Sequence, residues 1–172
     1  MKKVSFRNDV LPLKDMLFRV ALRITLNRAE AEDVVQETLI KLWNRREQWD
    51  EIASMEAFAT SICRHLALDR QKLMDNRSQL LDTAEHDAPD PSAAANPAVQ
   101  AEANDRVELV KRLMDRLPEK QRTCMQLRDI EGKPYKEIAT VMGITEQQVK
   151  VNIFRARQTI RQQFLETDRY GL

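Results

Sequence analysis

A segment rich in proline, alanine and acidic residues divides this chain into two helix-forming parts. The stretch HDAPDPSAAANPAVQAEAN, residues 86–104, contains three prolines and few large apolar side chains. Such a segment has too little apolar surface to offset the conformational entropy that it would lose on ordering. We therefore predict a flexible linker over residues 81–105. The linker limits the fold to two small domains, one at residues 1–80 and the other at residues 106–172.

Apolar residues recur at helical spacing in the first domain, and no stretch of the chain has the alternating pattern of a β-strand. Asn27 and Glu30 have the spacing of a capping box at the start of the second helix, and Ser54 precedes the third. The predicted helices cover residues 10–26, 28–47, 55–74 and, as a short fourth helix, 77–84.

The second predicted helix has two different faces. Trp43 lies close to its buried stripe, which predicts a core position for this side chain. The stripe itself consists of Ala31, Val35, Leu39 and Leu42. On the other face an isoleucine lies among polar and acidic residues, where it is out of place unless a partner covers it. An ordinary amphipathic helix with one stray isoleucine is the alternative. The candidate partner face contains Asp33, Gln36, Glu37 and Ile40.

A pair of helices joined by a short turn is predicted near the C-terminus. Gly143 ends the first helix, and Thr145 with Gln148 forms a capping box that opens the next. Two helices with a three-residue turn of this kind have the form of a helix-turn-helix. The helices of this domain are predicted to run through Val107–Leu117, from Pro118 to Gly132, from Pro134 to Met142 and from Thr145 to about Phe164.

The last of these helices combines a buried face with a basic and aromatic one. The residues expected to be buried are Val149, Ile153, Ala156 and Ile160. The outward face carries Gln147, Val151, Phe154, Arg155 and Gln158. In a major groove, Gln and Arg match base edges and apolar atoms meet the thymine methyl group. Phosphates could be neutralised by Arg157, Arg161 and Lys136. A solvated helix whose Phe154 packs against a neighbour is the alternative.

Charge and composition narrow the class of protein further. Residues 82–108 carry 7 acidic side chains and 1 basic one, whereas residues 109–172 carry 13 basic and 8 acidic ones, which suggests modules that face anions on either side of the linker. With only 3 Gly and no paired-carboxylate, nucleophile or Cys/His metal pattern, we expect no enzyme, no metal and no cofactor. Cys63 and Cys124 are expected to be free, buried thiols.

No apolar run approaches the ~20 residues that span a bilayer, and the N-terminus MKKVSFRNDV lacks the apolar stretch of a signal peptide. We therefore expect a cytoplasmic protein that does not insert into a membrane.

Three stretches resemble the extracytoplasmic-function sigma factors, a group of bacterial RNA polymerase initiation subunits. LPEKQRTCMQLRDIEGKPYKEIATVMGITEQQVKVNIFRARQTI is similar to their −35-reading domain, AEAEDVVQETLIKLWNRREQW to their core-polymerase-binding helix, and FATSICRHLALDRQKL to the helix that reads and helps to melt the −10 element. The resemblance implies an all-α protein of two small helical domains, the second containing a helix-turn-helix. It also implies transcription initiation at promoters with −10 and −35 elements.

The same resemblance implies partners and contact residues. The core polymerase, through its β′ coiled coil and its β subunit, and promoter DNA would be direct partners, and an anti-sigma factor would occlude the same faces. The β′ coiled coil would cover Asp33, Gln36, Glu37 and Ile40. The −10 strand would lie along Arg64, Arg70, Gln71 and Lys72 beside the loop 44–54, with Asp69 on the buried side of its helix. The −35 element would meet Lys136, Gln147, Lys150, Val151, Phe154, Arg155 and Arg157.

A free-standing helix-turn-helix regulator of the LuxR kind is the alternative function. It would bind duplex DNA without polymerase, as a dimer, with the N-terminal half as a sensor. If the chain acts as a sigma factor, an extended linker would be needed to bridge two promoter elements while polymerase holds the domains apart. Free of polymerase, the two domains could instead fold against each other and hide both DNA-binding faces.

Overall fold

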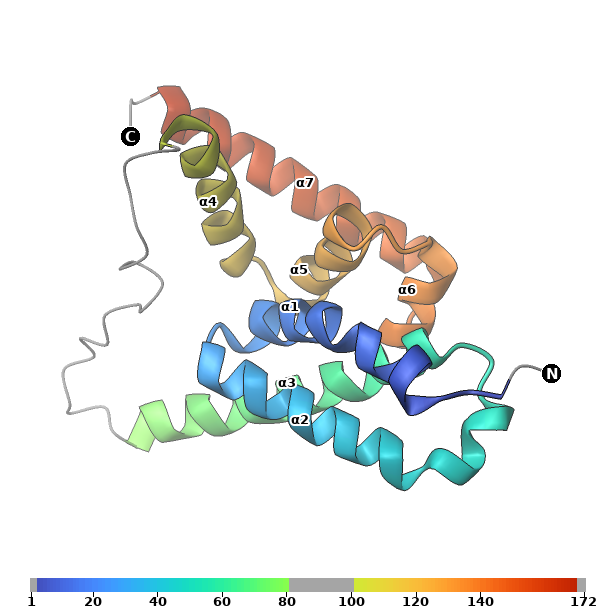
Figure 1. The fold of residues 1–172 in the computed structure, drawn as a ribbon. Coiled ribbons are helices and arrows are strands. Elements are labelled where there is room, and N and C mark those ends of the chain that lie inside the picture. Colours follow the sequence, from blue (N-terminus) through green and yellow to red (C-terminus); the bar gives the residue numbers. More distant parts are fainter. Residues whose placement is uncertain (1–2, 81–100, 170–172) are drawn as a thin grey trace.

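The computed structural model describes residues 3–80 and 101–169, and within these residues the fold is all-α (Figure 1). Residues 81–100 of the predicted linker lie outside the described residues, whereas its last positions, residues 101–105, already belong to a helix. The Ala-rich sequence there contains neither Pro nor Gly, so nothing prevents the helix from starting early.

The first domain consists of three long helices with short connecting turns. A π-type turn, η1 (Phe6–Val10), and a 3₁₀ turn, η2 (Leu11–Leu13), lead into α1 (Lys14–Thr25), which is followed by α2 (Arg28–Asn44), the 3₁₀ turn η3 (Arg46–Glu51) and α3 (Met55–Leu80). The predicted break near residue 75 is wrong, because α3 continues through it to Leu80, so the described part of the fourth predicted helix is the end of α3. Residues 81–84 of that prediction lie outside the described residues.

Local capping bonds fix where these helices start. The Asn27 side chain accepts a hydrogen bond from the Glu30 backbone N–H at 3.0 Å, and the Ser54 hydroxyl accepts one from the Ala57 N–H at 3.2 Å. Both predicted starts are therefore confirmed. The Glu30 carboxylate does not complete the capping box, because it pairs instead with Arg70 on α3.

The second domain contains α4 (Ala101–Asp115), α5 (Glu119–Met125), the π-type turn η5 (Gln126–Ile130), α6 (Tyr135–Met142) and α7 (Glu146–Arg169). Gly132 and Gly143 have φ values of 70° and 67°, the left-handed conformation that ends a helix and that glycine adopts without strain. The capping box at α7 is complete: the Gln148 N–H donates to Thr145 Oγ1 at 3.1 Å, and the Thr145 N–H donates to Gln148 Oε1 at 3.0 Å. The predicted helix-turn-helix is thus present as α6 and α7.

The two domains pack directly on each other. In Figure 1, α5 and α6 lie against α1 and α3, and one continuous apolar cluster joins residues of both domains. Leu17 and Cys63 of the first domain belong to the same buried cluster as Leu127 and Ile138 of the second. A separate cluster, formed by α4, α5 and α7, lies within the second domain. Burial of large apolar side chains between the domains stabilises this closed arrangement.

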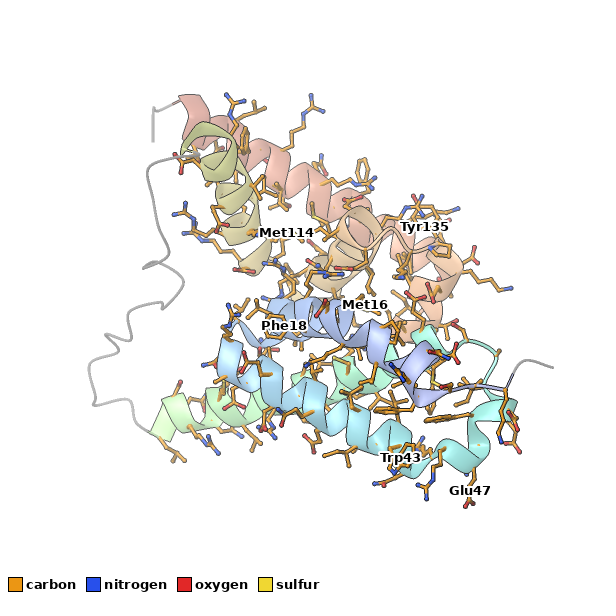
Figure 2. The ribbon with its side chains drawn as sticks, viewed as in Figure 1. Met16, Phe18, Trp43, Glu47, Met114 and Tyr135 are labelled. Atoms are coloured by element: carbon orange, nitrogen blue, oxygen red, sulfur yellow. The ribbon has the colours of Figure 1, made fainter. Side chains whose placement is uncertain are left out.

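Ion pairs surround the shared core. Figure 2 shows the side chains that lie between α1 and the second domain. Arg64 of α3 binds both carboxylate oxygens of Glu119 at 3.0 Å each. Three further pairs cross the interface: Arg19 with Glu131, Arg23 with Asp115, and Lys133 with Glu56. The closed arrangement is therefore held by charge pairing as well as by apolar contact.

Besides the break near residue 75, two further expectations for the first domain were wrong. Trp43 is 47% exposed, and the core position at this end of α2 is filled by Trp49, whose indole N–H donates to the Leu42 carbonyl at 3.0 Å. Phe6, Trp43 and Trp49 form an aromatic cluster in which Trp43 is the outer member. Asp69, expected on the buried side of its helix, is exposed on α3.

Candidate interaction surfaces

The outer face of α2 carries an exposed apolar side chain among polar ones. Ile40 is 60% exposed, Asp33 and Gln36 are exposed, and Glu37 is half-buried. The inner face of the same helix is closed by Ala31, Val34, Val35, Thr38 and Leu42. These four outer residues, which we call the α2 strip, therefore lie on one accessible face, as their spacing predicts.

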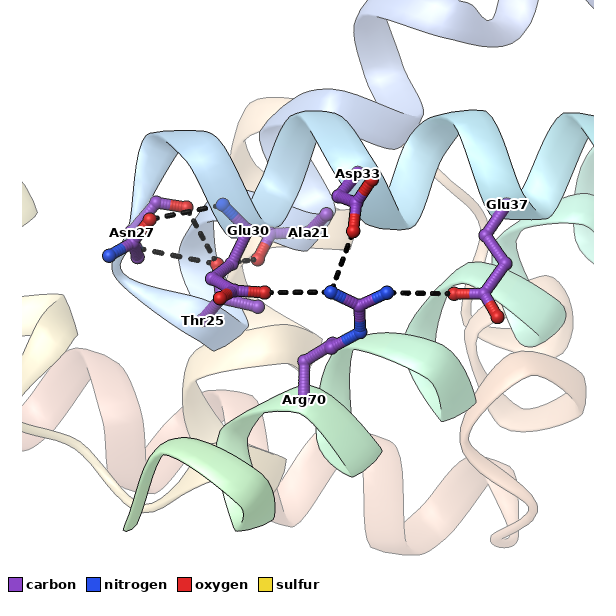
Figure 3. Close-up of polar contacts among 7 residues, drawn as sticks. All are labelled: Ala21, Thr25, Asn27, Glu30, Asp33, Glu37 and Arg70. Carbon is purple, nitrogen blue, oxygen red and sulfur yellow. Dashed lines mark hydrogen bonds and ion pairs between the residues drawn. The ribbon is translucent and has the colours of Figure 1, made fainter. Parts of the chain in front are cut away.

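Arg70 of α3 connects this strip to the neighbouring helix (Figure 3). Its guanidinium contacts Glu30 at 2.9 Å, Asp33 at 2.7 Å and Glu37 at 3.3 Å. The hydrogen bond to Asp33 raises the pKa of Arg70 most, and the one to Glu30 raises it further, so the guanidinium remains charged. Sequence reasoning grouped Arg70 with the −10 strand, and it missed these carboxylate contacts because they depend on how α3 packs against α2.

The four residues expected to follow the −10 strand are not equally accessible. Lys72 is exposed and Gln71 is half-buried, but the Arg64 side chain is only 8% exposed and is paired with Glu119 of the second domain. In this closed arrangement the Arg64 guanidinium is therefore enclosed, and its role at the −10 strand stays a prediction. Its guanidinium is blocked by a contact between residues 55 positions apart, which no local pattern could reveal.

The helix-turn-helix presents its predicted outer face to solvent. Val149, Ile153, Ala156 and Ile160 are buried, as predicted, and Phe154 on the other side is 65% exposed. Val151, also predicted to meet the −35 element, is half-buried. The other residues predicted for that element are exposed: Lys136, Gln147, Lys150, Arg155 and Arg157.

A shallow hollow of about 250 Å³ lies on this face. It is lined by Lys120, Ile144, Gln147, Gln148, Val151, Asn152 and Arg155. Lys120 comes from the start of α5 and faces the same hollow as Arg155 of α7. Sequence reasoning missed Lys120, because its proximity to α7 depends on the packing between the two helices.

Two basic residues of this face already have partners within the chain. Arg157 Nε donates to Asp129 Oδ2 at 3.0 Å, and this hydrogen bond raises the pKa of Arg157. The Lys150 ammonium lies 5.5 Å from the centre of the Tyr135 ring, within the range of a cation–π contact. Because both side chains remain exposed, these contacts orient them without enclosing them.

Both cysteines are free and buried, in agreement with the sequence prediction. Burial raises the pKa of Cys63 and that of Cys124 to about 12. Burial also lowers the pKa of Arg122, whose Nη1 donates to the Asp115 carbonyl at 2.9 Å. None of these groups lies on the α2 strip or on the outer face of α7.

Among residues 3–80 and 101–169, none of the helices is both long enough and apolar enough to span a bilayer.

Comparison with known sequences identifies both domains. Residues 10–73 match the family described as sigma-70 region 2, and residues 108–160 match the family described as sigma-70, region 4. The chain is 31% identical over 147 residues to the ECF RNA polymerase sigma factor SigL of Mycobacterium tuberculosis, covering 85% of this chain and 81% of SigL. It is also 31% identical over 165 residues to the probable RNA polymerase sigma factor RfaY of Xanthomonas campestris, covering 94% of this chain but only 41% of RfaY.

Two solved structures share the fold. The sigma factor RpoE of Bartonella quintana, solved in complex with the anti-sigma factor NepR, superimposes with a TM-score of 0.75 at 23% sequence identity, covering 95% of this chain and 98% of that one. CnrH, solved in complex with the cytosolic domain of CnrY, gives a TM-score of 0.66 at 20% identity, covering 95% of this chain and 88% of that one.

A helical protein with region 2 followed by region 4, the latter built on a helix-turn-helix, has the architecture of the sigma-70 class of transcription initiation factors. Within that class, this chain belongs to the extracytoplasmic-function (ECF) RNA polymerase sigma factors. No finding supports the alternative of a LuxR-like regulator.

Proposed function

We propose that this chain binds core RNA polymerase through the α2 strip and reads a two-part promoter with α3 and α7. The observation that carries the proposal is the exposure of Ile40 and Phe154, at 60% and 65%, on two faces whose opposite sides are well packed. Large apolar side chains exposed in a polar surrounding are typical of surfaces that a partner covers. The protein would act in the cytoplasm, where polymerase and the promoter are found.

On the polymerase side, Ile40 would be the apolar anchor, and the acids beside it would pair with basic residues of the β′ coiled coil. Fully desolvated apolar anchors supply much of the affinity of such interfaces, whereas charge complementarity supplies partner choice and association rate. Further contacts would involve the β subunit. This division of roles gives Ile40 the larger share of the binding free energy.

On the −35 side, the N-terminal half of α7 would enter the major groove. Gln147, Lys150 and Arg155 would meet base edges and phosphates, and Val151 and Phe154 would contact thymine methyl groups. Lys136 and Arg157 would contact the backbone, joined by Lys120 across the hollow from Arg155.

On the −10 side, α3 and the loop before it would hold the melted strand. No covalent chemistry is needed, because strand opening follows from tighter binding of the open state than of the duplex. Gln71 and Lys72 are accessible for this role in the free chain, whereas Arg64 would become available only after Glu119 moves away. Arg70 would likewise have to leave its carboxylates to reach DNA.

The closed arrangement suggests an order of events. Two promoter elements nearly two helical turns apart span roughly 60–70 Å, so one compact body would not present both readers at once. Core polymerase would separate the two domains so that each could reach its own promoter element. A dedicated anti-sigma protein would act in the opposite sense by covering these faces; both structural neighbours were solved with a second protein, and in the RpoE complex that protein is an anti-sigma factor.

The test is transcription in vitro with purified core polymerase and a promoter library, together with co-elution of the chain with core enzyme. The double variant Ile40→Glu with Glu37→Lys should weaken co-elution while leaving helix content unchanged. Specific, tight binding to promoter duplex without polymerase, combined with no co-elution, would overturn the proposal in favour of a free-standing regulator.

A further inference from the structure

One arginine of α3 organises the acidic part of the α2 strip. Arg70 Nη1 lies 2.7 Å from Asp33 Oδ2 and donates to Glu30 Oε2 at 2.9 Å, and Nη2 donates to Glu37 Oε2 at 3.3 Å (Figure 3). Figure 3 shows this single guanidinium between carboxylates that follow one another along α2. Asp33 and Glu37 are members of the strip, so the geometry places Arg70 beside the polymerase-binding face.

The manner of pairing leaves the carboxylates available to a partner. Arg70 donates to one oxygen of Glu30 and to one oxygen of Glu37, and its Nη1 lies 2.7 Å from one oxygen of Asp33. The Asp33 and Glu37 side chains are 56% and 41% exposed. The pair between Arg64 and Glu119 is different, because there the guanidinium engages both oxygens of one carboxylate.

Without Arg70 these carboxylates would repel one another. Acidic residues three and four positions apart on a helix are neighbours, and like charges at this spacing destabilise the arrangement. Each free side chain would also sample several rotamers, and a partner that binds it must restrict them at a cost in entropy. Arg70 counters both effects, since it offsets part of the negative charge and holds Asp33 and Glu37 toward one side of the helix.

We propose that Arg70 is a positioning residue for the polymerase-binding face, acting through Asp33 and Glu37 rather than through DNA. The inference rests on the function proposed above, in which this face meets basic residues of core polymerase. The Arg70 side chain is itself 28% exposed, less than either of these acids, which suits a supporting role.

Removing Arg70 also has an effect on polymerase binding that is opposite to the loss of positioning. Removing Arg70 makes the strip more negative by one charge, which favours encounter with a basic partner. At physiological ionic strength the screening length is about 8 Å, so one charge changes the association rate only modestly. Loss of positioning instead affects the bound state and should appear in the dissociation rate, where most affinity differences between related complexes arise.

The experiment measures association and dissociation rates of the full chain with core polymerase for Arg70→Gln. We expect binding about three- to tenfold weaker, mainly through faster dissociation, a size typical of coupling between contacting residues. Arg70→Lys, which keeps the charge but not the planar fork, should restore part of the affinity. Arg77→Gln removes one positive charge from the same helix two turns further on and serves as the matched control, with no change expected.

A second background separates positioning from general stability. In the variant Asp33→Asn with Glu37→Gln, the further change Arg70→Gln should have no effect on core binding, because the groups through which Arg70 acts are gone. An equal loss in both backgrounds would show that Arg70 only stabilises the domain and would overturn the proposal. Unchanged or tighter core binding by Arg70→Gln would also overturn it, as would a loss confined to single-stranded −10 DNA.

The same measurements test the underlying function independently. If Ile40→Glu binds core polymerase as tightly as the unmodified chain, the strip is not the polymerase contact, and the proposed function fails first. If Ile40→Glu binds weakly while Arg70→Gln binds normally, only the role of Arg70 is refuted.

Discussion

The pair between Arg64 and Glu119 should control whether the two domains stay together. It joins α3 to the start of α5, and the two side chains are only 8% and 17% exposed. The change Glu119→Gln preserves the size and shape of the side chain but removes its charge. Arg64 would then remain enclosed in the closed arrangement without its carboxylate partner, whereas in an open arrangement water would solvate it.

The size of the effect follows from that burial. Removing one partner of a buried ion pair costs about 3–5 kcal/mol. The glutamine oxygen can still accept one hydrogen bond from the guanidinium, which is worth about 1 kcal/mol. About 2–4 kcal/mol therefore remains, and because this cost arises only in the closed arrangement, the equilibrium should shift toward the open one by between about 30-fold and 700-fold, at 1.4 kcal/mol for each factor of ten.

The shift can be measured by energy transfer between dyes on the two domains. Lys41 of α2 and Gln162 of α7 are exposed, so cysteines introduced there can be labelled. The two native cysteines are buried, and burial raises their pKa to about 12, so they should react slowly. Glu119→Gln should lower the transfer efficiency and increase binding of a single-stranded −10 oligonucleotide by the free chain, since both effects require the domains to separate.

The matched control is Glu32→Gln, which breaks the exposed pair between Arg28 and Glu32 within α2. Exposed helix pairs of this kind are worth only about 0.3–0.5 kcal/mol and this one does not cross the interface, so transfer should not change. Unchanged transfer in Glu119→Gln, with normal helix content, would refute the reasoning that this pair holds the domains together.

Three further predictions concern single sites. Arg155→Ala should weaken promoter binding by about 1–3 kcal/mol and so lower promoter-specific transcription, while binding to core polymerase stays unchanged. Equal losses in transcription and co-elution assays would contradict the assignment. Leu26→Gly should raise the free energy of unfolding in urea by about 0.5–1 kcal/mol, because Leu26 has a φ of 56°, and a decrease would show that its packing outweighs the strain. Burial raises the pKa of Cys63 and Cys124 from 9.0 to about 12, so on raising the pH the unfolded chain loses its thiol protons before the folded chain does. The free energy of unfolding should therefore fall as pH rises above about 9. Urea midpoints that stay constant between about pH 8 and 10 would argue against this burial.

The parts of the fold that sequence reasoning predicted well depend on neighbouring residues. The Thr145–Gln148 capping box and the left-handed turn at Gly143 involve groups within a few positions of one another, so spacing and residue type are sufficient to place them. The buried stripe of α7 follows in the same way from the helical repeat. The positions of the cap, the turn and the buried stripe therefore depend on residues close in sequence and not on how the rest of the chain packs.

Sequence reasoning could not place side chains whose surroundings depend on how separate elements pack together. Trp43 and Trp49 are both suited to the core at the end of α2, and only the path of η3 makes Trp49 the buried one. Arg64 has the residue type and position of a strand-binding cation, but its environment is set by Glu119 in another domain. Helical periodicity describes one element at a time and contains no information on such packing.

The closed arrangement affects the three candidate surfaces unequally, and this suggests how the free chain can still be recruited. Contacts between the domains are made mainly by α1 and α3 on one side and by α5, η5 and α6 on the other, with Asp115 at the end of α4 pairing with Arg23. The α2 strip and the outer face of α7 lie outside these contacts and remain exposed. Arg64 of α3, which is expected to follow the −10 strand, is enclosed by its pair with Glu119 of the other domain. The expectation that closure hides both DNA-binding faces therefore fails for the −35 face. Under the proposed function, a chain with this asymmetry would meet core polymerase without first opening, and the binding free energy gained at Ile40 would then be available to separate Arg64 from Glu119. In that order, strand binding would follow polymerase binding, and Glu119→Gln should weaken the dependence of strand binding on core polymerase.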